Sequence, residues 1–209
     1  MKKVITIISI CILTTSLLCA RDISITVKAG AHWKEKREPQ CAIWLEDTQG
    51  NYISTLYVTE RASKKNWIMG PAQGRPESLP VWYHTSNYAA EKKTKKRPAT
   101  TQFDAVTSAT PKGNILSKHT IVDTACVIKA EFNTSFDYNE SYTKKNSGVN
   151  GQPSVIYQAL IPQEATGDIT LSFAGTGTLN GSDGVIHTQT EGLTTATTIV
   201  DSISLSFSK

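Results

Sequence analysis

The chain has 209 residues, with 22 Lys and Arg against 18 Asp and Glu, and a formal net charge of +4. Without Lys2 and Lys3, which lie in a candidate leader sequence, the formal net charge is +2. A net charge this small does not indicate a nucleic-acid partner. A chain of this length is suited to one globular domain.

The first residues have the parts of a secretory leader. Lys2 and Lys3 form a basic start, and the stretch Val4–Leu18 is almost entirely apolar. This stretch is shorter than the roughly 20 apolar residues that a membrane span needs, and Ala20 is a small residue at a plausible cleavage point. We therefore expect residues 1–20 to be a signal peptide, and the mature protein to be periplasmic or secreted.

Cys19 offers a different processing route. Cleavage before this residue would leave a lipidated cysteine at the new N-terminus, and the protein would then be lipid-anchored at the envelope. Lipoprotein processing normally uses a small residue before the cysteine, and Leu18 is bulky. We keep lipidation of Cys19 as the alternative to cleavage after Ala20.

Apolar residues alternate with polar ones at several places in the mature chain, which predicts short β-strands. The first strand is expected at 23–27, and a β-hairpin is expected over 41–58 with its turn at Gly50 and Asn51. Later strands are expected at 120–132, 154–161, 169–173 and 203–207. Strands packed on one face predict an all-β fold, an antiparallel immunoglobulin-like β-sandwich formed by residues 21–209.

Residues 59–118 break this pattern. Prolines punctuate the segment, and only 83–96 is suited to a helix. The segment is too long for an ordinary loop, so we expect a long irregular, partly helical insertion that forms a partner-facing or ligand-facing surface. Its aromatic residues are interpreted either as a stacking platform for a ligand or as core packing of the insertion. These residues are Trp67, Trp82, Tyr83 and Tyr88.

The mature chain keeps two cysteines, Cys41 and Cys126. In an oxidising compartment they are candidates for one disulfide that closes a long loop. The alternative is two separate buried thiols, since a free cysteine packs as a small hydrophobe. The sequence leaves both open.

Several stretches occur in an order that is typical of one family. They are Ala42–Asp47 with Gly50–Tyr52, Leu79–Tyr83, Asp104–Pro111, Ser135–Asn139 and Asn150–Ser154, followed by the ending stretches Gly181–Gly184 and Leu193–Ala196. This ordered set resembles the predicted periplasmic proteins called domain of unknown function 2271. The resemblance implies a small immunoglobulin-like β protein of uncharacterised role, often found alongside membrane redox proteins and flavin transferases.

Segment 104–110 also resembles the FMN-acceptor motif of covalently flavinylated proteins. That motif runs Asp, two variable residues, Ser or Thr, usually Gly, then Ala and Thr; here Ser108 replaces the glycine. The resemblance implies that the Thr110 hydroxyl carries FMN, and that Asp104 and Thr107 help the transferase to hold the segment. Such a flavin would supply the redox chemistry while the protein tunes it. The alternative is a polar turn closed by the proline that follows.

Other constellations receive little support. The four histidines have no second ligand at metal-binding spacing, and the oxygen-rich turns 137–140 and 180–184 lack the calcium-loop pattern. The basic run 92–97 is interpreted as a solvated edge or as a site for anionic groups. No nucleophile elbow or phosphate loop is present in the sequence.

We therefore expect a non-catalytic binding module in an extracytoplasmic flavin-linked redox system, with a membrane redox protein or a flavin transferase as candidate partner. One alternative is a covalent FMN electron carrier flavinylated at Thr110. Another is a structural envelope domain without a redox role. We expect no metal and no nucleic-acid partner.

Overall fold

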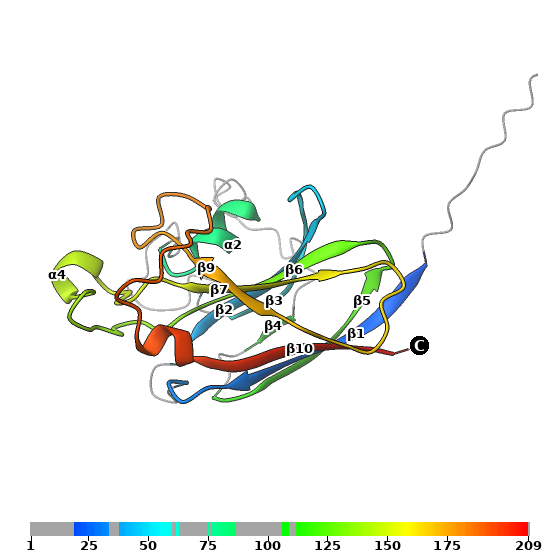
Figure 1. Ribbon diagram of the computed structural model, residues 1–209, viewed down its shortest axis with the longest axis horizontal. Helices are drawn as coiled ribbons and strands as arrows, with labels where there is room; N and C mark the ends of the chain where they lie inside the picture. The colour runs from blue at the N-terminus through cyan, green and yellow to red at the C-terminus, as the bar shows by residue number, and fades with distance from the viewer. Residues whose placement is uncertain are drawn as a thin grey trace, which may run out of the picture.

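The computed structural model describes residues 19–33, 38–59, 62, 75, 77–86, 106–108 and 112–208. These residues form two β-sheets packed against each other, which confirms the predicted all-β sandwich (Figure 1). Among the described residues every strand pair is antiparallel except the short β3–β4 pair, which is parallel. The immunoglobulin-like assignment stays a prediction. No helix in the described ranges has the length and apolar character that crossing a membrane requires.

The first sheet has four strands in the order β5-β1-β10-β8. Its strands are β1 (Ala20–Ala29), β5 (Ile115–Val122), β8 (Asp168–Thr170) and β10 (Val200–Ser208). Alternation in β1 turns Ile23, Ile25 and Val27 inward, where all three are buried. β1 thus forms the centre of this sheet and confirms the strand expected at 23–27.

The second sheet has six strands in the order β4-β3-β2-β6-β7-β9. Its strands are β2 (Gln40–Asp47), β3 (Tyr52–Thr59), β4 (Val106–Ser108), β6 (Cys126–Asn133), β7 (Val155–Ile161) and β9 (Ser172–Thr176). β2 and β3 form the predicted hairpin. Its turn is held by Asp47, whose carboxylate accepts hydrogen bonds from the backbone N–H groups of Gln49 (2.9 Å) and Asn51 (2.8 Å).

Two strand predictions were wrong in extent, because the chain crosses from one sheet to the other within each predicted span. The strand expected at 120–132 is divided between β5 and β6, and the chain turns at 123–125 to cross from one sheet to the other. The strand expected at 169–173 changes sheet at Leu171, so that β8 pairs with β10 and β9 pairs with β7. Continuous strand-forming composition does not reveal such a crossing, because residues on both sides of it suit a sheet.

The main core lies between the two sheets. Ile25, Phe132 and Leu205 are fully buried there and belong to one hydrophobic cluster. The Phe132 ring makes edge-on contacts with Trp33 and Tyr157, each with ring centroids 6.2 Å apart. This cluster joins both sheets into one body.

A second layer covers the outer face of the six-stranded sheet. Helix α2 (Pro80–Thr85) lies over this face (Figure 1) and begins at a proline, as helices often do. Its buried Trp82 belongs to a separate cluster with Trp44 and Ile156. The described helix starts three residues before the expected 83–96 span. Trp82 and Tyr83 are buried, so core packing is the correct interpretation for these two.

The other aromatic residues of that set, Trp67 and Tyr88, and the basic run 92–97 lie outside the described residues.

The long connections gather at one end of the sandwich. Residues 134–154 join β6 to β7 and include α4 (Lys144–Ser147), and residues 177–199 join β9 to β10 and include the 3-10 helix η2 (Thr195–Thr198). We call this the loop end. The start of β1 and the C-terminus lie at the opposite end (Figure 1).

Candidate functional site at the loop end

Stretches that lie far apart in the sequence meet at the loop end. Ser135–Asn139 and Asn150–Ser154 belong to the connection before β7, whereas Gly181–Gly184 and Leu193–Ala196 belong to the connection before β10. Buried or half-buried polar side chains join these stretches, as described below. These contacts between the two connections hold this end of the molecule in one shape.

Asp137 is the centre of the first network. Its buried carboxylate accepts hydrogen bonds from Gln152 Nε2 (2.9 Å) and from the Thr195 hydroxyl (2.6 Å). The Gln152 Oε1 atom accepts a hydrogen bond from the Thr194 N–H at 2.7 Å. A Cβ at Gly151, which has φ +75°, would lie 2.5 Å from the Asp137 backbone, so glycine is required at this close approach.

Asn139 ties the same two connections at a second point. Its Oδ1 atom accepts the N–H groups of Ser141 (3.0 Å) and Tyr142 (2.8 Å), which closes a local turn. Its Nδ2 atom donates to the carbonyl of Gly192 (2.8 Å) and to the Thr194 hydroxyl (3.0 Å). One side chain thus uses its whole hydrogen-bonding capacity on these two connections.

Arg75 joins the 59–118 segment to the loop end. Its guanidinium donates to Ser135 Oγ (3.0 Å) and to Asn150 Oδ1 (2.5 Å). Asn150 is buried and donates in turn to the carbonyl of Glu77 at 3.0 Å. No local pattern in the sequence predicts these contacts of Arg75, because Ser135 and Asn150 are 60 and 75 positions away.

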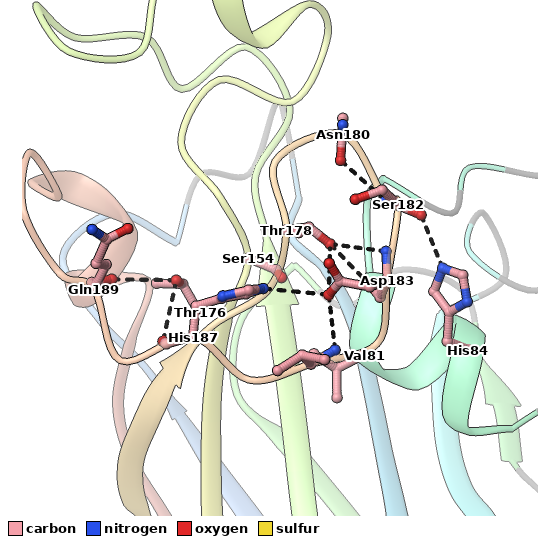
Figure 2. Close-up of polar contacts among 12 residues, drawn as sticks. Val81, His84, Ser154, Thr176, Thr178, Asn180, Ser182, Asp183, His187 and Gln189 are labelled. Atoms are coloured by element: carbon pink, nitrogen blue, oxygen red, sulfur yellow. Dashed lines mark hydrogen bonds and ion pairs between the residues drawn. The ribbon is translucent and has the colours of Figure 1, made fainter.

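The turn at 180–187 packs against α2. His84 on α2 is directed at this turn and its Nε2 atom lies 2.9 Å from the Gly181 carbonyl (Figure 2). Asp183 accepts the Val185 N–H at 2.9 Å, and this bond, with His187 at 3.3 Å, lowers the pKa of the Asp183 carboxyl. The oxygen atoms of this turn therefore serve local hydrogen bonds.

An aromatic patch stands on the outside of the loop end. We define it as Phe136, Tyr138 and Val149, which are 45%, 36% and 47% exposed. The Phe136 and Tyr138 rings meet edge to face with centroids 6.3 Å apart. Phe136 has a left-handed backbone with φ 62°, and its N–H donates to the Val149 carbonyl at 2.8 Å.

Glu131 is a buried charge that the sequence analysis missed. The carboxylate accepts hydrogen bonds from the first turn of α2, at the N–H groups of Val81 (3.3 Å) and Trp82 (2.8 Å), and from the Ser154 hydroxyl (2.6 Å). Burial raises the pKa of Glu131 to about 7, although these three bonds lower it. A Cβ on Gly177 would meet Ser154 Oγ at 2.5 Å, so glycine leaves the space for this cluster.

A signal for the buried charges was present in the strand pattern. Lys129 and Glu131 occupy alternate positions of a strand that is otherwise strongly apolar. Side chains two residues apart share one face, so the outer face of β6 carries charge. Lys129 pairs with the buried Glu46 at 2.7 Å, and Glu46 also accepts the Trp44 indole N–H at 2.7 Å.

The flavin-acceptor residues are only partly described. Thr107 lies in β4, where its Cα is paired with Val58 of β3. Asp104 and Thr110 lie outside the described residues. The middle of segment 104–110 therefore lies on β4, one of the two outermost described strands of the six-stranded sheet, and the two ends of the segment are undescribed.

Cys41 and Cys126, the two cysteines for which the sequence left a disulfide open, are not bonded to each other. Both residues are buried free thiols. Cys41 pairs with Phe132 and Cys126 pairs with Asp47, at opposite ends of the β2–β6 ladder. This register separates them by roughly 20 Å, far beyond the Cα spacing of a disulfide, which is at most about 7 Å. Two separate core cysteines, the other alternative, therefore agree with the register and with the burial of both side chains. Burial raises the pKa of both thiols.

No cluster of three or more His, Cys, Asp or Glu side chains within the described ranges is arranged to hold a metal ion. The two oxygen-rich turns of the sequence analysis use Asp137, Asn139 and Asp183 in the hydrogen bonds given above. Their described geometry is that of structural turns.

Comparison of the chain with models of protein families, with curated proteins and with solved structures finds no match.

Proposed function

We propose that the protein is an exported, non-catalytic binding module of the periplasm or cell envelope, acting in a flavin-linked redox system. The observation that supports the binding role is the backbone of Phe136. A non-glycine residue with φ near +60° costs on the order of 1–3 kcal/mol, and here that conformation holds a ring that is 45% exposed. Exposed aromatic rings are typical of protein-binding surfaces.

The residues behind the aromatic patch support the same role. Asp137 follows Phe136 directly, and its side chain is fixed by Gln152 and Thr195. A patch held in place before the partner arrives loses little conformational entropy on binding. The loop end is therefore suited to recognising a partner surface without rearranging.

The cellular setting of this proposal rests on the sequence. The leader favours export, and the resemblance to domain of unknown function 2271 favours an immunoglobulin-like module beside a membrane redox protein or flavin transferase. Such a fold hosts many unrelated functions, so the partner has to be found by experiment.

Site-specific photo-cross-linking in intact cells tests the proposal. A photoreactive phenylalanine is placed at Phe136, and a matched control is placed at Leu116, which is 70% exposed on β5 of the other sheet. We expect a discrete product from position 136 and none from position 116, and mass spectrometry should identify a membrane redox protein or flavin transferase. Equal products at both positions, or none at either, would favour the plain structural envelope domain.

Phe136→Gly separates recognition from folding. Glycine adopts φ 62° without strain, so we expect the free energy of unfolding to change by less than about 1 kcal/mol. The photoreactive group is moved to Tyr138, the neighbouring ring of the patch. Cross-linking from that position should fall strongly in the Phe136→Gly background. A variant that binds as well as the original would show that the Phe136 ring is not part of the interface.

A covalent FMN electron carrier is the second candidate, and one observation favours it. Residues 106–108 form β4 at the end of the strand order, with β3 as its described neighbour. A transferase has easier access to such a strand than to a central one. In the proposed modification the Thr110 hydroxyl oxygen attacks the FMN-side phosphorus of FAD, the pyrophosphate bond breaks, AMP leaves and the hydroxyl proton passes to the transferase. Asp104 and Thr107 position the segment for this step.

Intact mass of the protein purified from its native envelope tests this second candidate. A mass excess of one FMN in the wild type, absent from Thr110→Ala, would establish the carrier and its site. Unmodified masses in both would exclude the carrier under those growth conditions. The same spectrum distinguishes a mature N-terminus at Arg21 from a lipidated Cys19.

A further inference from the structure

Three side chains at the loop end supply the groups of an acyl-transfer reaction. They are the hydroxyl of Thr195, the carboxylate of Asp137 and the amide of Gln152. Thr195 Oγ1 donates to Asp137 Oδ2 at 2.6 Å. Gln152 Nε2 contacts both, at 2.9 Å from the same Asp137 oxygen and 2.6 Å from Thr195 Oγ1. A nucleophile, a base and an acyl group therefore lie within one hydrogen-bonded triangle.

The Asp137 carboxylate is placed to activate the hydroxyl. A neutral threonine hydroxyl is a weak nucleophile, and it becomes reactive when an adjacent base takes its proton. The hydrogen bond of 2.6 Å puts Asp137 within reach for that transfer. Because the same carboxylate oxygen contacts Gln152 Nε2, Asp137 is placed both to take the proton from the hydroxyl and to deliver it to the amide nitrogen.

The carbonyl oxygen of Gln152 has a donor of its own. Oε1 accepts the Thr194 N–H at 2.7 Å. A backbone N–H at a carbonyl oxygen stabilises the negative charge that develops there when the carbonyl carbon is attacked. That carbon, Cδ, is one bond away from the Nε2 atom that Thr195 Oγ1 already contacts. A small rotation of either side chain therefore brings the hydroxyl oxygen to Cδ.

The fold holds these groups together and keeps water away from them. Gln152 is 1% exposed and Asp137 is 7% exposed. Gly151 forms a β-bridge with Asp137, and the Gln152 N–H donates to the Asp137 carbonyl at 3.0 Å. Thr195 is the first residue of η2. Fixed geometry of this kind favours reaction between groups of one chain, and the scarcity of water protects an ester product from hydrolysis.

We propose that Thr195 and Gln152 form an intramolecular ester bond that cross-links the two connections of the loop end. Thr195 Oγ1 attacks Gln152 Cδ while Asp137 takes the hydroxyl proton. The Thr194 N–H stabilises the oxygen that becomes negative. The Cδ–Nε2 bond then breaks, the proton passes from Asp137 to the nitrogen, and ammonia leaves. A hydroxyl and an amide become an ester and ammonia, so the reaction balances without a co-reactant.

The reaction takes place once in each chain, so it is compatible with a non-catalytic binding role. It does not depend on the proposed partner of the aromatic patch, and its failure would leave that role untouched.

Peptide mass spectrometry of the wild-type protein tests the proposal. A protease that cleaves after glutamate cuts at Glu164 and Glu191, which lie between Gln152 and Thr195. We expect one linked pair of peptides that is lighter than the sum of its two parts by one ammonia. Mild base should open the ester and leave glutamate at position 152. Two separate peptides, whether or not one of them has lost ammonia, would refute the proposal.

Variants assign the roles of the side chains. Thr195→Val keeps the shape without the hydroxyl and should give no linked peptide, whereas Thr195→Ser should restore it. Asp137→Asn keeps the size without the base, and should slow the linkage about a hundredfold or more when protein is analysed at equal times after synthesis. Thr197→Val is the matched control, because it removes another η2 hydroxyl, which donates to the Thr194 carbonyl at 2.9 Å.

The control variant should link as the wild type does. Linkage in Thr195→Val, or linkage at the wild-type rate in Asp137→Asn, would overturn the assignment. The wild-type digest decides the existence of the ester even if a variant fails to fold.

Discussion

The inner face of the six-stranded sheet is buried against the other sheet, whereas its outer face is covered in part by α2, and the two faces are stabilised by different interactions. The inner face packs apolar residues of β2 and β6 against the other sheet, and these residues are Cys41, Ile43, Leu45, Cys126, Ile128, Ala130 and Phe132. The outer face of the same strands carries Trp44 and Glu131, which contact α2, and the ion pair of Glu46 with Lys129. Strands β2 and β6 therefore contribute apolar side chains to the core on one face, and charged or hydrogen-bonded side chains to the other face.

This difference determines how each face responds to change. The inner face is stabilised by non-directional burial, so any residue of similar size and polarity serves. The outer face depends on particular partners, because a buried polar group that loses its partner keeps its desolvation cost. The inner face should be insensitive to pH, whereas the outer face contains Glu131, whose pKa is raised to about 7.

The largest effect is expected from Phe132→Ala on the inner face. Phe132 is fully buried between two aromatic neighbours, and removing such a ring costs about 3–5 kcal/mol of unfolding free energy. Urea denaturation followed by fluorescence measures this loss. A loss below about 1 kcal/mol would mean that the inner core can collapse around the cavity.

The pH dependence of Glu131 tests the outer face. Its pKa is about 7 in the folded protein against an ordinary 4.5, so between these values the folded state binds more protons than the unfolded state. The contribution of Glu131 to stability is therefore full below about pH 4.5 and is lost as the pH rises through 7, by about 3 kcal/mol in total. Glu131→Gln should remove this slope in urea denaturation measured across that range. An identical slope in the variant would assign the pH dependence to another group.

A smaller loss is expected from Lys129→Met. This change leaves the buried Glu46 carboxylate without its 2.7 Å ion pair, at a cost of about 1–3 kcal/mol, since the lysine is near the surface. Adding Glu46→Gln removes the orphaned charge and keeps an acceptor for Trp44, so the double variant should recover part of the loss. Additive losses would show that the pair is not coupled.

The smallest effect is expected from Leu116→Ser. Leu116 is 70% exposed on β5, and substitutions at such positions usually change the unfolding free energy by less than about 0.5 kcal/mol. Thermal denaturation provides the measurement. A substantial loss would reveal a packing contact on the outside of the four-stranded sheet.

The alternation of apolar and polar residues predicts several strands and one hairpin turn, but it does not predict where the chain crosses between sheets or where α2 packs. The alternation of Ile23, Ile25 and Val27 and the hairpin turn at Gly50 are local signals, because each depends on neighbours in the sequence. The crossing at Leu171 and the position of α2 over Glu131 depend on partners far along the chain. For the candidate site, the motif stretches were found by resemblance, but their meeting at the loop end was not predicted.

The sequence by itself determined that this chain builds a β-sandwich, because period-two burial is encoded residue by residue. Only the tertiary structure decided that Cys41 and Cys126 stay apart, since the β2–β6 register sets their distance. It also decided that Phe136 is presented on a loop whose next residue, Asp137, is hydrogen-bonded to Gln152 and Thr195. Each of these depends on contacts between segments separated by tens of residues, and such contacts leave no local trace in the sequence.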